Sequence, residues 1–346
     1  MTDHTTYGLV CSELSDDLSK TNLGELKLDS FDSNSVKISI KAASLNFPDL
    51  LMTQGKYQNR PELPFALGME GSGIVEKIGS EVSSLKEGDE VMFGGWGHGA
   101  IAKSIILPES LVSLKPKKLN FSEAASFKTA YLTAYVGLIR RGELKKDETL
   151  LVHGASGGVG MAAVQMGKLY GARVIASGTS DEKLKIVKSW GADEVINTGF
   201  EGSVSFREKV KELTNNKGAD VIYDPVGGDV FDESIRCINW GGRLLIIGFT
   251  SGRIPTVPVN YPLIKGFSVI GVRAGEFGRK DPIKGKENNE IIMELAESGK
   301  LAPHICKEFP LEQAKEGLKY LKERKLVGKV TCLLYTSPSP RDPHLS

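Results

Sequence analysis

A glycine-rich turn at residues 154–160 is the feature that most constrains how this chain can fold. It follows a short apolar run and precedes a helical pattern. The small residue Ala155 allows a tight bend, although glycine is usual at this position. Gly157 allows a pyrophosphate to approach the backbone, and Gly160 allows the helix to pack closely on the strand. The phosphates then lie on free N–H groups at the helix N-terminus. The turn predicts a dinucleotide site formed by Ser156, Gly157, Gly158, Val159 and Gly160.

The segments around the turn support this prediction. After it, Met161, Val164 and Leu169 recur at roughly helical spacing, and residues 172–177 form a second strand-like run. Strand, turn, helix and strand in this order make a βαβ unit. Helical and strand patterns continue to alternate to about residue 272. The pattern therefore predicts a doubly wound α/β domain with a parallel sheet.

The residues at the end of the second strand indicate which dinucleotide binds. An acidic residue about 20 positions after the glycines normally holds the ribose 2′-hydroxyl of NAD. Residues 176–179 contain no acid. Ser180, Asp181, Glu182 and Lys183 follow, so the segment offers hydroxyls and one cation, and we interpret the two acids as the first turn of a helix. We therefore expect NADPH, with Ser177 and Lys183 as ligands of its 2′-phosphate. A structural interpretation is compatible with this one: Ser180 caps a helix and Lys183 lies on its solvated surface.

Composition and charge exclude several classes of partner. The chain has 346 residues, 40% hydrophobic and 25% charged, which suits two globular domains. Lysine plus arginine number 44 against 43 aspartate plus glutamate, so we expect neither a nucleic-acid nor a membrane partner. The N-terminus shows no secretory or transit pattern, which predicts a cytoplasmic protein. The four cysteines lack paired spacing, which argues against disulfides or a structural zinc site.

Residues 1–125 have the pattern of a β-rich, compact barrel. Their short apolar segments are broken by Gly, Pro, Asn and Asp, and residues 35–41 alternate as a half-buried strand does. A helical pattern from Phe121 to Ile139 begins the second domain. Within that domain Asp224 ends a buried strand. We expect Asp224 to anchor a loop or to lie near the cofactor ribose rather than to catalyse.

Several motifs follow one another in order along the chain. They are Ala43-x-x-Asn46-x-x-Asp49, Gly55-x-Tyr57, Pro64-x-x-x-Gly68-x-Glu70-x-x-Gly73, Gly88-Asp89-x-Val91, residues 129–134, residues 154–160, Gly241-Gly242-Arg243-Leu244, Ile247-Gly248-Phe249 and Gly328-Lys329-Val330. The ordered set resembles the medium-chain dehydrogenase/reductase superfamily, and within it the zinc-independent NADPH:quinone oxidoreductases. The resemblance extends from about residue 30 to residue 333.

This resemblance implies a division into two domains. Residues 1–125 and 274–333 are expected to form a GroES-like, β-rich catalytic domain, and residues 126–273 a Rossmann cofactor domain. Residues 334–346 fall outside the resemblance and contain three prolines. We expect them to be either a disordered extension or a remnant of cloning or sequence assembly, without a function.

The same comparison implies that metal chemistry is absent. Zinc-dependent relatives use a cysteine and a histidine as ligands where this chain has Asn46 and Met69. An amide beside a thioether makes no credible tetrahedral zinc site. His98 has no paired ligand, and His153 lies inside a predicted strand, so we interpret His98 as a loop or core residue and His153 as a packed side chain. We expect no metal.

The resemblance also implies the reaction and its residues. Hydride passes from NADPH to an electron-poor acceptor held between the domains, and quinones are the first candidates. Asn46 and Tyr57 match positions that line the cleft and are the catalytic candidates for orienting the acceptor oxygen. The alternative is that both side chains are structural, with Asn46 bonded to nearby backbone and Tyr57 a wall of the pocket. Thr133 and Phe249 match positions beside the cofactor.

Two other functions stay open, and one partner is implied. Some family members reduce enones or enoyl thioesters, and others keep the fold and bind a dinucleotide or RNA without catalysis. In relatives the last strand of the parallel sheet, here residues 268–272, pairs with its copy in a second subunit. Because an apolar edge strand needs such cover, we expect a homodimer.

Overall fold

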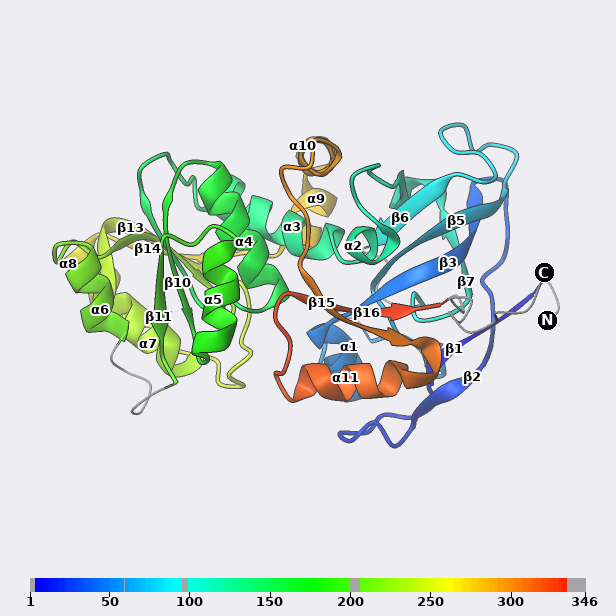
Figure 1. Ribbon diagram of the computed structural model, residues 1–346, viewed down its shortest axis with the longest axis horizontal. Coiled ribbons are helices and arrows are strands. Elements are labelled where there is room, and N and C mark those ends of the chain that lie inside the picture. The colour runs from blue at the N-terminus through cyan, green and yellow to red at the C-terminus, as the bar shows by residue number, and fades with distance from the viewer. Residues whose placement is uncertain (1–3, 59, 95–98, 200–205, 335–346) are drawn as a thin grey trace, which may run out of the picture. The chain divides into compact units, whose positions relative to one another are not determined.

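The computed structural model describes residues 4–58, 60–94, 99–199 and 206–334, and the chain divides into two compact units. The first unit comprises Met1–Lys128 and Ile305–Ser346, and the second comprises Thr129–His304 (Figure 1). The first is rich in mostly antiparallel β-strands, and the second contains a parallel sheet with helices. The predicted fold class is therefore confirmed.

Residues 274–304 belong to the second unit, whereas the sequence placed them with the β-rich domain. They contain α9 (Ala274–Lys280) and α10 (Pro282–Glu297). Arg140 of the second unit binds α10, because its Nε donates to Asn288 Oδ1 at 2.8 Å and its Nη2 lies 2.9 Å from Glu287 Oε2. This contact joins side chains far apart in the sequence, which no local pattern reveals.

A six-stranded parallel sheet forms the second unit, in the order β11-β10-β9-β12-β13-β14. Counted along this unit, the order is 3-2-1-4-5-6, which is that of dinucleotide-binding folds. The order reverses beside β9, and ligands of such sheets bind at the carboxyl ends of the strands there. The strands are β9 (Thr149–Val152), β10 (Arg173–Gly178), β11 (Glu194–Asn197), β12 (Ala219–Asp224), β13 (Ile238–Ile246) and β14 (Ser268–Gly271).

Helices alternate with these strands, as the sequence predicts. They are α3 (Lys128–Tyr135, which begins at the last residue of the first unit), the π-helix η2 (Val136–Arg141), α4 (Gly158–Leu169), α5 (Asp181–Ser189), α6 (Phe206–Leu213), α7 (Gly228–Cys237) and α8 (Asn260–Lys265). No helix among the described residues is long and apolar enough to cross a bilayer.

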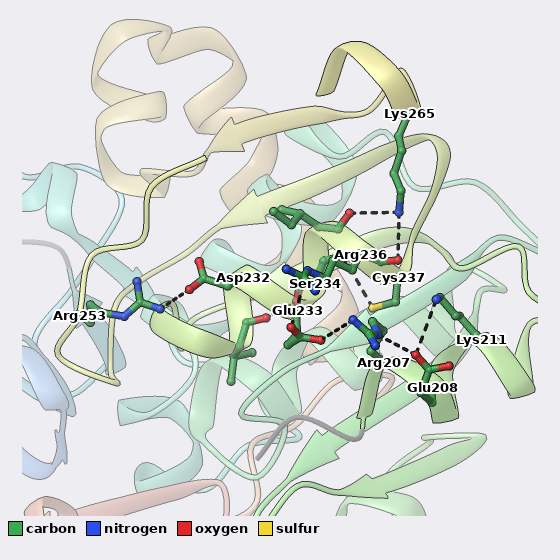
Figure 2. A network of polar contacts seen from close by, with 12 residues as sticks. Arg207, Glu208, Lys211, Asp232, Glu233, Ser234, Arg236, Cys237, Arg253 and Lys265 are labelled. Carbon is green, nitrogen blue, oxygen red and sulfur yellow. Dashed lines mark hydrogen bonds and ion pairs between the residues drawn. The ribbon is translucent and has the colours of Figure 1, made fainter. Parts of the chain in front are cut away.

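Polar contacts tie α6 and α8 to α7 (Figure 2). Arg207 Nη1 of α6 lies 3.3 Å from Glu233 Oε2 of α7. Lys265 of α8 donates to the carbonyls of Ile235 and Arg236 at 3.2 and 3.0 Å, which satisfies acceptors at the C-terminal end of α7. These contacts fix α7 and with it Ser234, which bonds to a residue beside the glycine turn.

Two sheets form the first unit. The larger has the order β15-β16-β3-β5-β6-β8 with β7 paired to β3, and the smaller has the order β2-β1-β4. All pairs are antiparallel except β15 with β16. The strands are β1 (Thr5–Cys11), β2 (Thr21–Lys27), β3 (Ser35–Leu45), β4 (Phe65–Ala66), β5 (Glu70–Ile78), β6 (Glu90–Gly94), β7 (Ser104–Pro108), β8 (Val112–Leu114), β15 (Ile305–Pro310) and β16 (Lys329–Leu333).

Short helices complete the first unit. They are α1 (Phe47–Thr53), η1 (Glu109–Leu111), α2 (Phe121–Ala125), η3 (Leu311–Gln313) and α11 (Ala314–Lys322). The helix predicted from Phe121 to Ile139 is not continuous, because α2 ends at Ala125 and α3 begins only at Lys128. The break is local: Phe127 N–H bonds to Ala124 O, a three-residue closure that ends an α-helix.

Candidate functional site

The glycine turn joins β9 to α4 in the second unit, as predicted. Gly154 has φ +56°, the left-handed region that favours glycine. Its carbonyl accepts the Gly157 N–H at 2.9 Å, and Gly157 is the N-cap of α4. The Ala155 N–H bonds to the carbonyl of Ser177 at 3.0 Å, so the turn is attached to the end of β10.

Packing within the turn explains why its last position is glycine. A Cβ on Gly160 would lie 2.4 Å from Gly154 O and 2.8 Å from Ala155 Cα, both backbone atoms that cannot rotate away. A Cβ on Gly157 would lie 3.4 Å from Gly154 O, an ordinary contact. Gly160 therefore lets the helix lie directly on the turn, which agrees with its predicted role.

The five predicted cofactor residues, Ser156–Gly160, lie together at the N-terminal end of α4. The first N–H groups of a helix have no carbonyl partner within the helix, and they carry the positive end of its dipole. Such an end binds phosphate well. The close approach at Gly160 and the position beside the strand reversal also fit the pyrophosphate of a dinucleotide.

A buried histidine, His153, directly precedes the turn and links β10 to α7. His153 is 1% exposed; its Nδ1 lies 2.7 Å from Ser177 Oγ and its Nε2 lies 2.9 Å from Ser234 Oγ. Ser234 donates its only hydroxyl proton to Val230 O, so it accepts from Nε2–H, and Nδ1 accepts from Ser177. Burial lowers the pKa of His153 to about 3, so the ring is neutral. The prediction that His153 is a packed side chain is confirmed.

Ser177 does not lie where a phosphate ligand should. Its side chain is 3% exposed and its hydroxyl bonds to His153. Both faces of a strand in a covered parallel sheet are buried, so the end of β10 does not expose this serine. The geometry does not fit the predicted contact between Ser177 and the 2′-phosphate, and we do not carry that contact forward.

The surroundings of Lys183 keep its predicted role open. Lys183 lies in the first turn of α5, where its N–H bonds to the capping Ser180 Oγ at 3.4 Å. The structural interpretation of Ser180 as an N-cap is therefore confirmed. The first acid after β10 is Asp181, whose carboxylate accepts from Asn197 Nδ2 at 2.8 Å. Asn197 is the β11 residue that pairs with Gly178, the last residue of β10, so this carboxylate lies beside the end of the strand.

The other predicted residues of the second unit lie on two more elements. Asp224 ends β12, is 1% exposed, and its Oδ1 accepts from the N–H groups of Val226 and Gly227 at 2.8 and 2.9 Å. It anchors the loop, as expected, and burial raises its pKa. Phe249 follows β13 with 39% of its surface exposed. Thr133 donates its hydroxyl to Thr129 O at 2.7 Å within α3.

In the first unit Asn46 belongs to a buried cluster with Glu70 and Lys329. Lys329 Nζ lies 2.6 Å from Asn46 Oδ1 and 2.9 Å from Glu70 Oε1, and Asn46 Nδ2 donates to the same Glu70 oxygen at 3.1 Å. Asn46, Glu70 and Lys329 are 9%, 0% and 6% exposed. A charged pair is thus shielded from water beside the predicted catalytic amide.

Two more charged groups adjoin this cluster. Asp49, fully buried in α1, accepts from the N–H groups of Asn46 at 2.7 Å and Gly68 at 3.1 Å, which fixes the backbone at both positions. Burial raises the pKa of Asp49 to about 7, although these N–H groups and Lys329 oppose the rise. Burial also lowers the pKa of Lys128, and the charge of Glu70 opposes that shift. Tyr57 is half-buried and packs against the hydrophobic core of this unit.

Sequence reasoning missed Glu70, Lys329 and Asp49 as site residues. All three stand inside motifs that carried the family resemblance, but no role was attached to them. For Lys329 the available signal was a lysine in a strand with no other charged residue, since a buried charge requires a partner.

Comparison with known proteins agrees with this architecture. Residues 32–117 match the family described as alcohol dehydrogenase GroES-like domain, and residues 158–285 match the family described as zinc-binding dehydrogenase. The quinone oxidoreductase-like protein 2 homolog of Nematostella vectensis is 37% identical over 330 residues, which cover 93% of this chain and 87% of the relative. The chain belongs to the quinone oxidoreductases of the medium-chain dehydrogenase/reductase superfamily.

Solved structures of the same fold resemble almost the whole of this oxidoreductase. The native structure of a mycobacterial protein complexed with NADPH is 28% identical, with a TM-score of 0.86, over 94% of this chain and 99% of that chain. The crystal structure of the CurK enoyl reductase is 26% identical, with a TM-score of 0.85, over 96% and 99% of the two chains.

One of the matched families is named for zinc, but the side chains of Asn46, Met69 and Glu70 do not suit that ion. Asn46 Oδ1 and Glu70 Oε1 both bind the Lys329 ammonium, and Met69 offers only a thioether. No group of three or more His, Cys, Asp or Glu side chains that could hold a metal occurs in residues 4–58, 60–94, 99–199 and 206–334. The absence of a metal stays a prediction, and His98 lies outside the described residues.

Proposed function

We propose that this oxidoreductase transfers a hydride from NADPH to quinones or related electron-poor acceptors, without a metal ion. The observation that carries the proposal is the buried amide of Asn46 beside the ion pair of Glu70 and Lys329, in a chain whose second unit has the glycine turn of a dinucleotide site. The family membership and the relative named quinone oxidoreductase-like support the reaction class.

NADPH, rather than NADH, is favoured by the end of β10. Residues 176–179 at the end of this strand contain no acid, whereas an NAD site normally places one there for the ribose 2′-hydroxyl. Lys183 in the first turn of α5 supplies a cation for a 2′-phosphate. A neighbour of the same fold is named as a complex with NADPH. Residues 156–160 and the α4 N-terminus would hold the pyrophosphate, and Phe249 and Thr133 would contact the rest of the cofactor.

In the proposed reaction Asn46 orients the acceptor. When bound, NADPH supplies the hydride, and a negative charge develops on the acceptor oxygen. The second N–H of Asn46 Nδ2 donates to that oxygen, which stabilises the charge as it forms. After hydride transfer, reduction of a quinone to the hydroquinone needs one proton. The Tyr57 hydroxyl supplies it, directly or through water, and is reprotonated from solvent. A phenol is a weak acid, so we assign Tyr57 the smaller effect.

Reduction of a conjugated double bond is the second candidate. It uses the same hydride and the same polarised oxygen, and one structural neighbour is named an enoyl reductase. Enones and enoyl thioesters would bind their carbonyl at the same Asn46 amide. The two candidates differ in the acceptor, and a direct assay separates them.

The test is initial-rate NADPH oxidation with an ortho-quinone, a para-quinone, an alkenal and a crotonyl thioester, with NADH as the cofactor control. We expect quinone reduction to be fastest and to depend on NADPH. Faster turnover of the alkenal or the thioester would assign the enzyme to the double-bond reductases. Tight NADPH binding without turnover of any acceptor would leave a non-enzymatic binding protein.

We also propose that the protein is a cytoplasmic homodimer. β14 is the outer strand of the parallel sheet, and the α8 region leaves Val259, Leu263 and Ile264 82%, 81% and 67% exposed. Exposed apolar side chains beside an open sheet edge favour pairing with a second copy. Light scattering should give twice the monomer mass, and Leu263→Glu with Ile264→Glu should shift it toward the monomer.

A further inference from the structure

The cluster of Asn46, Glu70 and Lys329 fixes the orientation of one amide. Lysine can only donate hydrogen bonds, so the Asn46 atom that faces Lys329 at 2.6 Å must be the carbonyl oxygen Oδ1. An ionised carboxylate can only accept, so the atom that faces Glu70 at 3.1 Å must be Nδ2. Without Lys329, Asn46 could rotate by half a turn about its last bond, because oxygen and nitrogen of an amide have nearly the same shape.

The ammonium of Lys329 has a second effect, on charge. Glu70 is 0% exposed, and Lys329 lies 2.9 Å from its carboxylate oxygen. If that carboxylate were not neutralised, its charge would oppose the negative charge that hydride transfer places on the acceptor oxygen. A hydrogen bond from an ammonium to Oδ1 also polarises the amide, which makes its N–H groups better donors.

We infer that Lys329 is the positioning residue of the acceptor site: it holds the Asn46 carboxamide with one N–H on Glu70 and the other free for an acceptor oxygen. This inference rests on the proposed function of Asn46. Lys329 itself need not touch the substrate. The effect travels through one hydrogen bond to Oδ1 and one ion pair to Glu70.

The experiment must separate positioning from folding, because Lys329→Met alone leaves the buried Glu70 carboxylate without the ammonium that pairs with it. The main variant is therefore Lys329→Met with Glu70→Gln, which removes both charges. Lys329→Arg is the conservative variant, and Lys325→Met is the matched control, since Lys325 is an exposed lysine of the same unit. Each is compared with Asn46→Ala for kcat, KM, NADPH dissociation constant and melting temperature.

We expect the double variant to bind NADPH as the wild type does and to lose about 100-fold in kcat, the effect of removing one well-placed donor to a developing charge. Adding Asn46→Ala to it should lower kcat no further, because both changes disable the same amide. Lys329→Arg should recover most of the loss, and Lys325→Met should change nothing. Wild-type kcat in the double variant, or a loss that adds fully to that of Asn46→Ala, would overturn the inference.

A second readout does not depend on any acceptor. Nuclear magnetic resonance of protein with ¹⁵N-labelled asparagine, with Asn46→Asp to assign the signal, reports the Asn46 side-chain N–H₂ group. We expect a shifted, slowly exchanging pair in the wild type and Lys329→Arg, and an averaged pair in the double variant. If no acceptor is reduced, the proposed function fails and this spectrum alone decides: identical Asn46 signals in the wild type and the double variant would refute the role of Lys329.

Discussion

The two candidate binding regions of this oxidoreductase are built by opposite means. The turn at residues 154–160 presents backbone N–H groups, and the side chains beneath it, His153, Ser177 and Ser234, form an uncharged network. The cluster around Asn46 instead buries an ion pair of Glu70 and Lys329. The first region is set by steric fit between backbone atoms, and the second by electrostatic pairing. The two should therefore fail in different ways.

The sharpest difference should come from removing one buried charge. Glu70→Ala leaves the buried Lys329 ammonium without its counter-ion, and we expect it to lower the free energy of unfolding by about 3–5 kcal/mol. Glu76→Ala, in the same strand, is the control: its pair with Lys37 at 3.5 Å is partly exposed, so the loss should be below about 1 kcal/mol. Denaturant titration measures both, and equal losses would contradict the electrostatic description of the cluster.

Steric fit should dominate in the turn. Gly160→Ala places a Cβ 2.4 Å from Gly154 O, so we expect a loss of about 1–3 kcal/mol in stability and weaker NADPH binding. Gly157→Ala adds a Cβ at an ordinary 3.4 Å and should keep the melting temperature while it weakens binding of the pyrophosphate. Thermal melts and fluorescence titration with NADPH separate the two effects. Equal melting temperatures for both variants would show that the turn has room to adjust.

The two regions should also respond to pH with opposite sign. Burial raises the pKa of Asp49 from 3.8 to about 7. Between these two pH values the Asp49 carboxyl is ionised in the unfolded chain and protonated in the folded chain. Its contribution to stability therefore falls as pH rises. Burial lowers the pKa of His153 from 6.5 to about 3. Between these two pH values the imidazole is protonated in the unfolded chain and neutral in the folded chain. Its contribution to stability therefore falls as pH falls. For each group the free energy of unfolding changes by about 1.4 kcal/mol per pH unit, and the two changes offset each other in the wild type.

Single variants should reveal the two slopes. Asp49→Asn should leave stability that decreases toward acid pH, and His153→Gln should leave stability that decreases toward neutral pH. Urea unfolding at several pH values between 3.8 and 6.5 measures both slopes. A change of slope in the same direction in both variants would contradict the assignment of these two groups.

The smallest effect is expected for Ser177. Because its hydroxyl bonds to His153 and is buried, Ser177→Ala should cost about 1 kcal/mol of stability and leave the Michaelis constant for NADPH unchanged. Lys183→Ala is the comparison, and it should raise that constant about 10-fold while sparing NADH, since a charge-assisted contact is lost. A raised constant for Ser177→Ala would restore this serine as a phosphate ligand.

The sequence predicted the second unit well because its signals are local. The turn, its flanking strand and its helix lie within residues 149–169, and their small residues are required by contacts among neighbours. The burial of Ser177 could not be predicted, because strand position alone does not say whether both faces of a sheet are covered. In the first unit Asn46 was identified by resemblance, but its bonding partners were not.

Local patterning thus determined the alternation of strands and helices, the turn and the lack of an acid in residues 176–179. The tertiary structure decided which charges meet. Lys329 lies 283 positions from Asn46 and 259 from Glu70 in sequence, and these residues come together only because β16 pairs with β3 and β3 pairs with β5. A buried ammonium is stable only where the folded chain supplies its partners, and that requirement cannot be read from residues that are distant in sequence.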